Sequence, residues 1–385
     1  MQTQVGIIGG GPAGLLLSHL LALEGIESIV LEQRSRQELE SIVRAAVLEQ
    51  GSVDLLKAIG AGERLMREGT VHHGIELRYL AQSHRVPLSE LTGGRAITLY
   101  PQHELVKDLI TLRLAAGGEV RFEARAVRIF DATVPTPVIA FEEHGNTHEI
   151  RCDFIVGCEG YSSLARQAFP QAQRREYQRQ YPFGWLGILV EARRIAPELI
   201  YARHAQGFAL VSTRSATLQR LYLQCEPQDT VADWPDARIW EALEVRLEAP
   251  LGAQPARGAI VEKDVVAMRS FVCEPMQFGR IFLAGDAAHI VPPTGAKGMN
   301  LAIADVRTLS AALVNHYQGD AQDLTRYSAT CLKRVWRAQR FSSWMTSLLH
   351  RFPDADEFRQ RLQLVELEAI ADSPIAARLL AERYV

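Results

Sequence analysis

The first residues whose spacing suggests chemistry are three glycines near the N-terminus. Gly9, Gly11 and Gly14 fit the pattern G-x-G-x-x-G, and the apolar run Val5–Ile8 precedes them. In a dinucleotide site the first glycine permits a tight turn, the second lets a pyrophosphate approach the backbone, and the third lets helix and strand pack closely. Glu32 ends the next apolar run, where a carboxylate can accept hydrogen bonds from a ribose diol. The pattern predicts dinucleotide binding.

A second stretch whose residues could take part in binding or catalysis spans residues 280–300. An apolar strand pattern runs into Gly285-Asp286, and a turn rich in proline and glycine then leads to a helix that begins near Lys297. A helix N-terminus presents free N–H groups and a positive dipole, which favour negative charge on a ligand. Asp286 itself has a second interpretation, as the N-cap of the helix that follows.

Together these stretches resemble the FAD-dependent aromatic hydroxylases, which are single-component flavoprotein monooxygenases. Further matching segments are Arg44–Gly51, Tyr181–Gly187, Arg214–Thr217 and Met345–Pro353, so the resemblance extends over nearly the whole chain. It implies an enzyme that converts 4-hydroxybenzoate, NAD(P)H and O₂ to 3,4-dihydroxybenzoate through a flavin C4a-hydroperoxide. A hydroxylase of another hydroxybenzoate, an NAD(P)H oxidase-type flavoprotein and a non-enzymatic flavin sensor are the alternatives.

The resemblance also implies which residues hold FAD. Asp286 is expected to bond the ribityl chain, and Arg44 and Gln102 to contact the pyrophosphate and neighbouring parts of the cofactor. Oriented N–H groups at residues 295–300 would stabilise the negative charge of a reduced flavin. The expected cofactor-binding residues are Gly9, Gly11, Gly14, Glu32, Arg44, Val47, Gln102, Arg220, Asp286, Lys297, Gly298, Met299 and Asn300.

For the substrate, the resemblance points to Ser212, Arg214 and Tyr222 around a carboxylate. The chemistry agrees, because arginine presents a planar fork to a carboxylate and hydroxyl groups complete its shell. Alternation along a strand would put residues 212 and 214 on one face. Without the resemblance, these residues read as ordinary polar positions of a sheet.

Hydroxylation next to a phenol OH requires an electron-rich ring, so the phenol should lose its proton. The family relays that proton through two tyrosines and a histidine, which correspond to Tyr201, Tyr384 and His72. The backbone carbonyl of Pro293 would complete the phenol contacts. Tyr384 is matched only across a one-residue deletion and precedes the terminal Val385, so a frayed C-terminus is a competing interpretation.

Four departures from the family pattern bear on the nicotinamide coenzyme. Ile42 stands where an arginine is common, Glu38 replaces a tyrosine, Glu159 replaces an aspartate, and Ser162 replaces a histidine. Carboxylates at Glu38 and Glu40, without a cation at 42, disfavour the 2′-phosphate of NADPH through charge repulsion. We therefore expect NADH to serve as well as NADPH or better. The residues linked to this coenzyme are Arg44, Ser162, Arg166, Arg269 and Glu38.

The elements that must position these residues change in character along the chain. Val5–Leu31 reads as a β-α-β unit, with a helix from Leu15 to Glu24. Alternating patterns in the middle predict strands, and three- and four-residue periodicity beyond residue 300 predicts helices. The fold class is α+β: a Rossmann-like FAD-binding domain over 1–175 (completed by about 268–300), a mixed or antiparallel β-sheet substrate domain over 176–285, and a helical flavin-contacting and interface segment over 286–385. The predicted strands are Ile75–Val86, Val120–Ile129, Gly184–Val190 and Ala216–Gln224, and the predicted helices Leu301–His316, Leu324–Leu349 and Asp356–Ala371.

Composition narrows the class of protein. The 385 residues carry a formal net charge of −3, which gives no reason to expect nucleic acid, and the basic run Lys333–Arg340 reads as one face of a helix. Five cysteines, an odd number without any C-x-x-C, argue against a disulfide scaffold or a zinc ribbon and favour a cytoplasmic protein. No metal site and no membrane segment are expected. The resemblance implies a homodimer.

Overall fold

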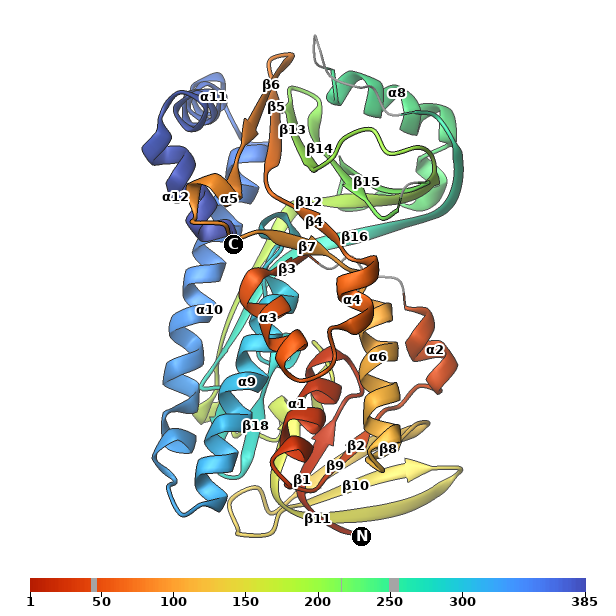
Figure 1. Ribbon diagram of the computed structural model, residues 1–385, viewed down its shortest axis with the longest axis vertical. Coiled ribbons are helices and arrows are strands. Elements are labelled where there is room, and N and C mark those ends of the chain that lie inside the picture. The colour runs from red at the N-terminus through yellow and green to blue at the C-terminus, as the bar shows by residue number, and fades with distance from the viewer. Residues whose placement is uncertain (43–46, 216, 249–255) are drawn as a thin grey trace.

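The computed structural model describes residues 1–42, 47–215, 217–248 and 256–385. These residues form two large sheets joined by a small one, with long helices along one side (Figure 1). The expected α+β class is confirmed.

Within the described residues, the first sheet has a centre of five parallel strands, whose carboxyl ends lie along one edge. Its parallel strands lie side by side in the order β18 (Ile281–Leu283), β11 (Asn146–Gly157), β1 (Gln2–Ile8), β2 (Ser28–Leu31), β8 (Glu119–Arg121). Three antiparallel strands extend it: β17 (Gln277–Phe278), β10 (Val138–Glu143), β9 (Ala124–Phe130). Central parallel strands are covered on both faces, which explains why they read as continuous apolar runs.

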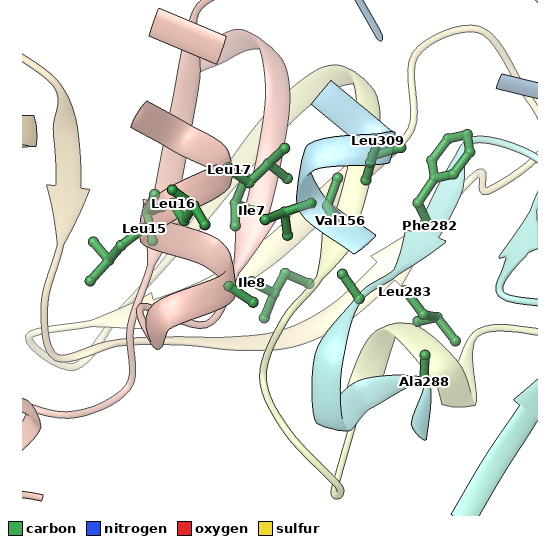
Figure 2. Close-up of a cluster of buried hydrophobic side chains, with 14 of the residues drawn as sticks. Ile7, Ile8, Leu15, Leu16, Leu17, Val156, Phe282, Leu283, Ala288 and Leu309 are labelled. Carbon is green, nitrogen blue, oxygen red and sulfur yellow. The ribbon is translucent and has the colours of Figure 1, made fainter. Parts of the chain in front are cut away.

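Helices cover this sheet and bury its apolar side chains. They include α1 (Pro12–Leu23), α6 (Gln102–Ala115), α9 (Gly298–Tyr317) and α10 (Gln322–Leu349). In Figure 2, Leu16 and Leu17 of α1 gather with Ile7 of β1, Val156 of β11 and Leu309 of α9. All five are fully buried, and each such side chain contributes about 1.5–3 kcal/mol relative to its exposed state. α1 begins three residues before the predicted start, because proline suits the first turn of a helix.

The second sheet is antiparallel except where β13 pairs with β5. Its strands lie in the order β19 (His289–Ile290), β16 (Ala259–Glu274), β12 (Arg175–Glu191), β15 (Leu218–Cys225), β14 (Gly207–Thr213), β13 (Leu199–His204), β5 (Ile75–Tyr79), β6 (Gln82–Val86). Because side chains alternate along a strand, Ile188, Val211 and Leu223 face α8 (Asp236–Arg246) and pack with its Trp240. The opposite face stays available for a binding site.

Two predicted strands are each two strands in the structure. Ile75–Val86 is the hairpin β5–β6, whose turn residues Leu80 and Ala81 adopt positive φ angles of 48° and 56°. Val120–Ile129 is divided between β8 and β9, because Glu123 also adopts a positive φ. The sequence did not indicate either turn, because apolar and polar residues alternate through both and no glycine or proline marks them.

The remaining elements connect the two large sheets and form the C-terminal end. β3 (Val47–Glu49), β7 (Ile97–Leu99) and β4 (Thr70–His72) make the small sheet. The C-terminal helices are α11 (Glu357–Asp372) and α12 (Pro374–Tyr384), and α12 lies against α5 (Leu88–Leu91) (Figure 1). The other short helices are α2 (Arg36–Ser41), α3 (Gln50–Ala58), α4 (Glu63–Glu68), α7 (Leu164–Gln167), η1 (Gln171–Gln173), η2 (Val231–Asp233), η3 (Gly285–Ala287) and η4 (Pro293–Gly295). Within the described ranges, no helix is both long and apolar enough to cross a membrane.

Candidate active site

A cavity of about 710 Å³ runs from the carboxyl edge of the first sheet to the open face of the second. Strand register explains its first half. Ile8, Leu31, Gly157 and Leu283, which end β1, β2, β11 and β18, are in register across the sheet. The residues that follow these four strands therefore converge at one edge, where open α/β sheets bind their ligands. Gly9, Glu32 and Cys158 directly follow β1, β2 and β11, Gly285 lies two residues after the end of β18, and all four line the cavity.

The glycine turn has the geometry expected of a dinucleotide site. Gly9 has φ +103°, and a Cβ on Gly14 would lie 2.0 Å from the Gly9 carbonyl oxygen, so both positions require glycine. A Cβ on Gly11 would meet nothing within 4 Å, which leaves room for a ligand at the start of α1. The buried Glu32 carboxylate accepts the Gly10 N–H at 2.8 Å and is thereby held at the cavity wall.

The Gly285-Asp286 turn forms η3 and presents Asp286 to the same cavity. Asp286 does not cap α9, whose N-cap is Lys297. Behind the turn, the buried Asp305 carboxylate accepts the Gly285 N–H at 3.2 Å and contacts His289 Nε2 at 2.5 Å. Burial favours a neutral imidazole, but the Asp305 charge and hydrogen bond together with the nearby Asp286 charge outweigh it and raise the pKa of His289. The turn therefore rests on a buried ion pair.

The N-terminus of α9 opens onto the cavity through Lys297, Gly298 and Met299. Lys297 Nζ donates to Glu49 Oε1 at 2.6 Å and to the Tyr384 carbonyl at 3.0 Å. Asn300 differs from the expectation, since its side chain does not line the cavity. Its amide instead binds backbone groups of Val47 and Glu49 at 2.8 and 2.9 Å and so holds β3 against α9.

These features fit FAD. The open position at Gly11, the Glu32 carboxylate and Asp286 would receive the pyrophosphate, ribose and ribityl groups. No described side chain caps the N-termini of α1 or α9, so their N–H groups are available for negative charge. Val47 and Gln102 also line this half of the cavity. Arg44 lies outside the described residues.

The second half of the cavity is built on the open face of the second sheet. Tyr201 of β13 is paired with Leu210 of β14, which is paired with Tyr222 of β15, so their side chains form one row. Ser212 follows two positions after Leu210, on the same face. Trp185 of β12 lies beside the row, with its ring centroid 5.0 Å from that of Tyr222. All five line the cavity.

Arg214 lies next to this wall, directly after β14. Its guanidinium is half-buried, and no described carboxylate lies within 4.0 Å of it. Burial lowers the pKa of Arg214, an effect that the neighbouring Tyr222 hydroxyl opposes. Its charge also helps to lower the pKa of His103, after burial and Lys107. Arg214 itself does not line the cavity, but it neighbours His103 and Tyr222, which both do.

The structure brings the two predicted relay tyrosines together. The hydroxyl groups of Tyr201 and Tyr384 are hydrogen-bonded, and Tyr384 is only 1% exposed, so the end of α12 is docked rather than frayed. Burial raises the pKa of both tyrosines. Pro293 lines the cavity nearby, and its carbonyl accepts the Ala296 N–H at 2.9 Å, which leaves one lone pair for a ligand.

His72 is fully buried on β4, and burial lowers its pKa to about 4. Its Nδ1 accepts the Leu199 N–H at 3.2 Å. In the described part of the chain, Nε2 has no hydrogen-bond partner, and neither tyrosine is bonded to the ring.

The other predicted residues are placed as follows. Arg220 does not line the cavity, because its guanidinium is paired with Glu262 at 3.1 Å and with Asp264 of β16. Ser162 lines the cavity next to Tyr161. The guanidinium groups of Arg269 and Arg166 lie 4.7 and 5.4 Å from the centre of the Tyr161 ring.

Glu38 lies on the short helix α2. Its carboxylate accepts the Ser35 N–H and hydroxyl at 2.9 Å each. These hydrogen bonds lower its pKa and keep it ionised. Glu40 is instead neutralised by Arg36 at 2.6 Å.

The sequence analysis did not single out Trp185 or His103, which line the cavity, and it named Glu159 only as a departure from the family pattern. Trp185 stood within a matching segment, but nothing marked it as a site residue. His103 follows Gln102 at the start of α6, and only this position next to an expected cofactor-binding residue could have indicated that it belongs to the site. Glu159 is half-buried, its partial withdrawal from water raises the pKa of its carboxyl, and the carboxylate accepts the Ala165 N–H at 2.8 Å.

Comparisons with known proteins agree with this geometry. Residues 2–342 match the family described as "FAD binding domain". The chain is 47% identical over 386 aligned positions to the p-hydroxybenzoate hydroxylase of Acinetobacter baylyi, covering 100% of this chain and 95% of that one. It is 26% identical to a 3-(3-hydroxy-phenyl)propionate/3-hydroxycinnamic acid hydroxylase of a Mycobacterium species, covering 83% and 56% of the two chains. The p-nitrophenol 4-monooxygenase structure from Pseudomonas putida shares its fold, with a TM-score of 0.81 at 16% identity over 100% and 98% of the chains.

Proposed function

The chain belongs to the FAD-binding-domain family and is an FAD-dependent aromatic hydroxylase, and on that premise we propose that its substrate is 4-hydroxybenzoate. The reaction would be 4-hydroxybenzoate + NAD(P)H + H⁺ + O₂ giving 3,4-dihydroxybenzoate + NAD(P)⁺ + H₂O. The A. baylyi relative, by its name, acts on the same acid.

The observation that supports this proposal is that one cavity has a cationic group beside one end and a tyrosine hydroxyl group at the other. At one end Arg214, without a carboxylate partner among the described residues, adjoins Ser212 and Tyr222 and suits a substrate carboxylate. At the other end Tyr201 presents a hydroxyl backed by Tyr384. One strand, β14, separates Tyr201 from Tyr222, so their backbones are about 10 Å apart. A single ring with para carboxylate and hydroxyl groups matches this arrangement.

The tyrosine pair would manage the phenol proton. Because burial raises the pKa of Tyr201, this tyrosine stays neutral at physiological pH and can hydrogen-bond the substrate oxygen. A proton leaving that oxygen can pass to Tyr201 as Tyr201 gives its own to Tyr384. We place His72 at the outer end, where its unpaired Nε2 would require a bridging water.

Bound FAD supplies the redox and oxygen chemistry. The residues of this chain bind and orient the substrate and the cofactor, and they exclude water. Tyr222, Trp185 and Leu210 form an apolar wall beside the ring, and the uncapped start of α9 would stabilise negative charge on the cofactor.

The test is oxidation of NADH and NADPH by purified protein with FAD in air, with and without 4-hydroxybenzoate, and with product analysis. We expect strong stimulation and one 3,4-dihydroxybenzoate per coenzyme oxidised. Stimulation that yields only hydrogen peroxide would make 4-hydroxybenzoate an effector, and a response to 3-hydroxybenzoate alone would transfer the proposal to that substrate.

We further propose that NADH serves as well as NADPH or better. Glu38 supports this, because its ionised carboxylate lies on the exposed helix α2 next to the cavity-lining Ile42. Glu40 adds less repulsion than the sequence suggested, since Arg36 neutralises it. The ratio of kcat/KM for the two coenzymes measures the preference, and a hundredfold advantage for NADPH would contradict it.

The expected homodimer and cytoplasmic location are also proposals. Support for a dimer comes from the C-terminal apolar patch, which we define as exposed side chains at helical spacing on α11 and α12. Its residues are Phe358, Leu362, Val365, Ile375 and Leu379, with 45–82% of each exposed.

A further inference from the structure

Trp185 is the one buried indole in the described cavity wall, and its N–H group is satisfied by a distant part of the chain. The side chain is 3% exposed, and its ring lies 5.2 Å from Phe208 and 5.0 Å from Tyr222. Indole nitrogen donates only, so a buried Trp needs an acceptor. Trp185 Nε1 donates to His350 Nε2 at 2.7 Å.

The surroundings of His350 set its protonation and its orientation. The ring is fully buried directly after α10, and its Nδ1 lies 3.0 Å from the Thr346 carbonyl oxygen. Because a carbonyl only accepts, the proton belongs on Nδ1, which leaves Nε2 as the acceptor for the indole. Burial lowers the pKa of His350 to about 3, so this arrangement persists at physiological pH. The ring is also stacked on Phe183, with centroids 4.7 Å apart and planes at 9°.

The same end of α10 contacts the opposite wall of the cavity. Thr346 Oγ1 is hydrogen-bonded to Thr294 Oγ1 at 3.0 Å, and Thr294 follows the cavity-lining Pro293. From α11, Gln363 Nε2 donates to the His350 carbonyl at 2.9 Å. The last turn of α10 thus connects the Pro293 turn with Trp185.

We propose that His350 is a positioning residue that fixes the plane of Trp185, and through it the place of Tyr222 at the carboxylate end. The inference rests on the proposed function and deepens it. Stacking alone does not require histidine, because phenylalanine would fill the same space. Only a group with an acceptor at the Nε2 position can satisfy the indole N–H.

Two substitutions separate the hydrogen bond from the packing. His350→Phe keeps the aromatic stack and removes the acceptor, whereas His350→Gln offers an amide oxygen to the indole. For His350→Phe we expect KM for 4-hydroxybenzoate to rise about fivefold, as for one lost buried hydrogen bond, with kcat for coenzyme oxidation nearly unchanged. The fraction of coenzyme released as hydrogen peroxide should rise, because a looser wall admits water. His350→Gln should restore most of both losses.

A double-mutant cycle tests whether His350 acts through Trp185. In a Trp185→Phe background no indole N–H remains, so adding His350→Phe should change KM and peroxide release by less than twofold. If His350→Phe does not fold, His350→Asn, whose shorter amide falls away from the indole, takes its place.

The inference would be overturned if His350→Phe had the same effect in the wild-type and Trp185→Phe backgrounds. It would also be overturned if the single variant His350→Phe kept the KM and the peroxide yield of the wild type. Wild-type protein that does not hydroxylate 4-hydroxybenzoate would instead refute the proposed function. The near-UV circular dichroism of Trp185 still tests the contact in that case, since His350→Phe should change this signal and His350→Gln should preserve it.

Discussion

At the residue scale, Arg214 differs from Arg220 and Arg166 because no described carboxylate is paired with its guanidinium. Arg220 is paired with two carboxylates. Arg166 donates hydrogen bonds to the Ala287 and Tyr161 carbonyls and forms an ion pair with Glu176. Withdrawing a guanidinium from water without a counterion costs free energy unless an anion binds to it. We propose that the substrate carboxylate is that anion in this site.

Replacing Arg214 should therefore weaken substrate binding far more than turnover. For Arg214→Gln we expect the dissociation constant of 4-hydroxybenzoate to rise about 10- to 100-fold, the range for a hydrogen bond to a charged group. It can be measured from the change in flavin absorbance on binding. The uncharged amide 4-hydroxybenzamide is the control, because its binding should differ little between wild type and variant. An equal loss for acid and amide would mean that Arg214 acts only on the fold.

At the element scale, the cavity-lining turn η3 is held from behind by α9. Asp305 Oδ2 of α9 accepts the Gly285 N–H and pairs with His289, so two buried polar groups behind the turn are satisfied in the apolar core. The ion pair raises the pKa of His289 above its unfolded value of about 6.5. Such a group stabilises the fold fully below the unfolded pKa and loses that contribution as pH rises through the folded pKa.

The variant His289→Gln should remove this pH dependence. The difference in free energy of unfolding between wild type and variant should be largest near pH 6 and should shrink toward pH 9. Urea denaturation at saturating FAD measures it at both pH values. A difference that grows with pH would mean that His289 is neutral in the folded protein.

At the scale of the whole molecule, one cavity joins two sheets, and the last C-terminal helix packs behind its Tyr201 wall. Lys297 holds the Tyr384 carbonyl, and Tyr384 binds Tyr201 of the second sheet. The outer faces of α11 and α12 carry the C-terminal apolar patch, so the elements that place Tyr384 are also the proposed dimer interface.

Charges in this patch should dissociate the dimer. We expect wild type at micromolar concentration to have the mass of two chains by light scattering after size-exclusion chromatography. The double variant Phe358→Glu, Ile375→Glu should have the mass of one, because burying two carboxylates in an apolar interface is unfavourable. Leu23→Glu, at an exposed apolar position on α1, is the matched control and should remain dimeric.

Local patterns determined the parts of this protein that lie within short stretches of sequence. The β-α-β unit, the glycine turn with Glu32, the Gly285-Asp286 turn and the three long C-terminal helices follow from periodicity and turn residues. The resemblance to the hydroxylases added Tyr201, Ser212, Tyr222 and Pro293, and the structure brings all four to one cavity.

Only the tertiary structure decided the pairings between distant residues. Tyr201 and Tyr384 are 183 positions apart, and Trp185 and His350 are 165 apart. It also turned Arg220 toward Asp264 and Asn300 toward β3, although both had been expected at the cofactor. The physical reason is that a buried polar group must find its partner wherever packing places one. The spacing of residues along the chain does not predict which residue that partner is.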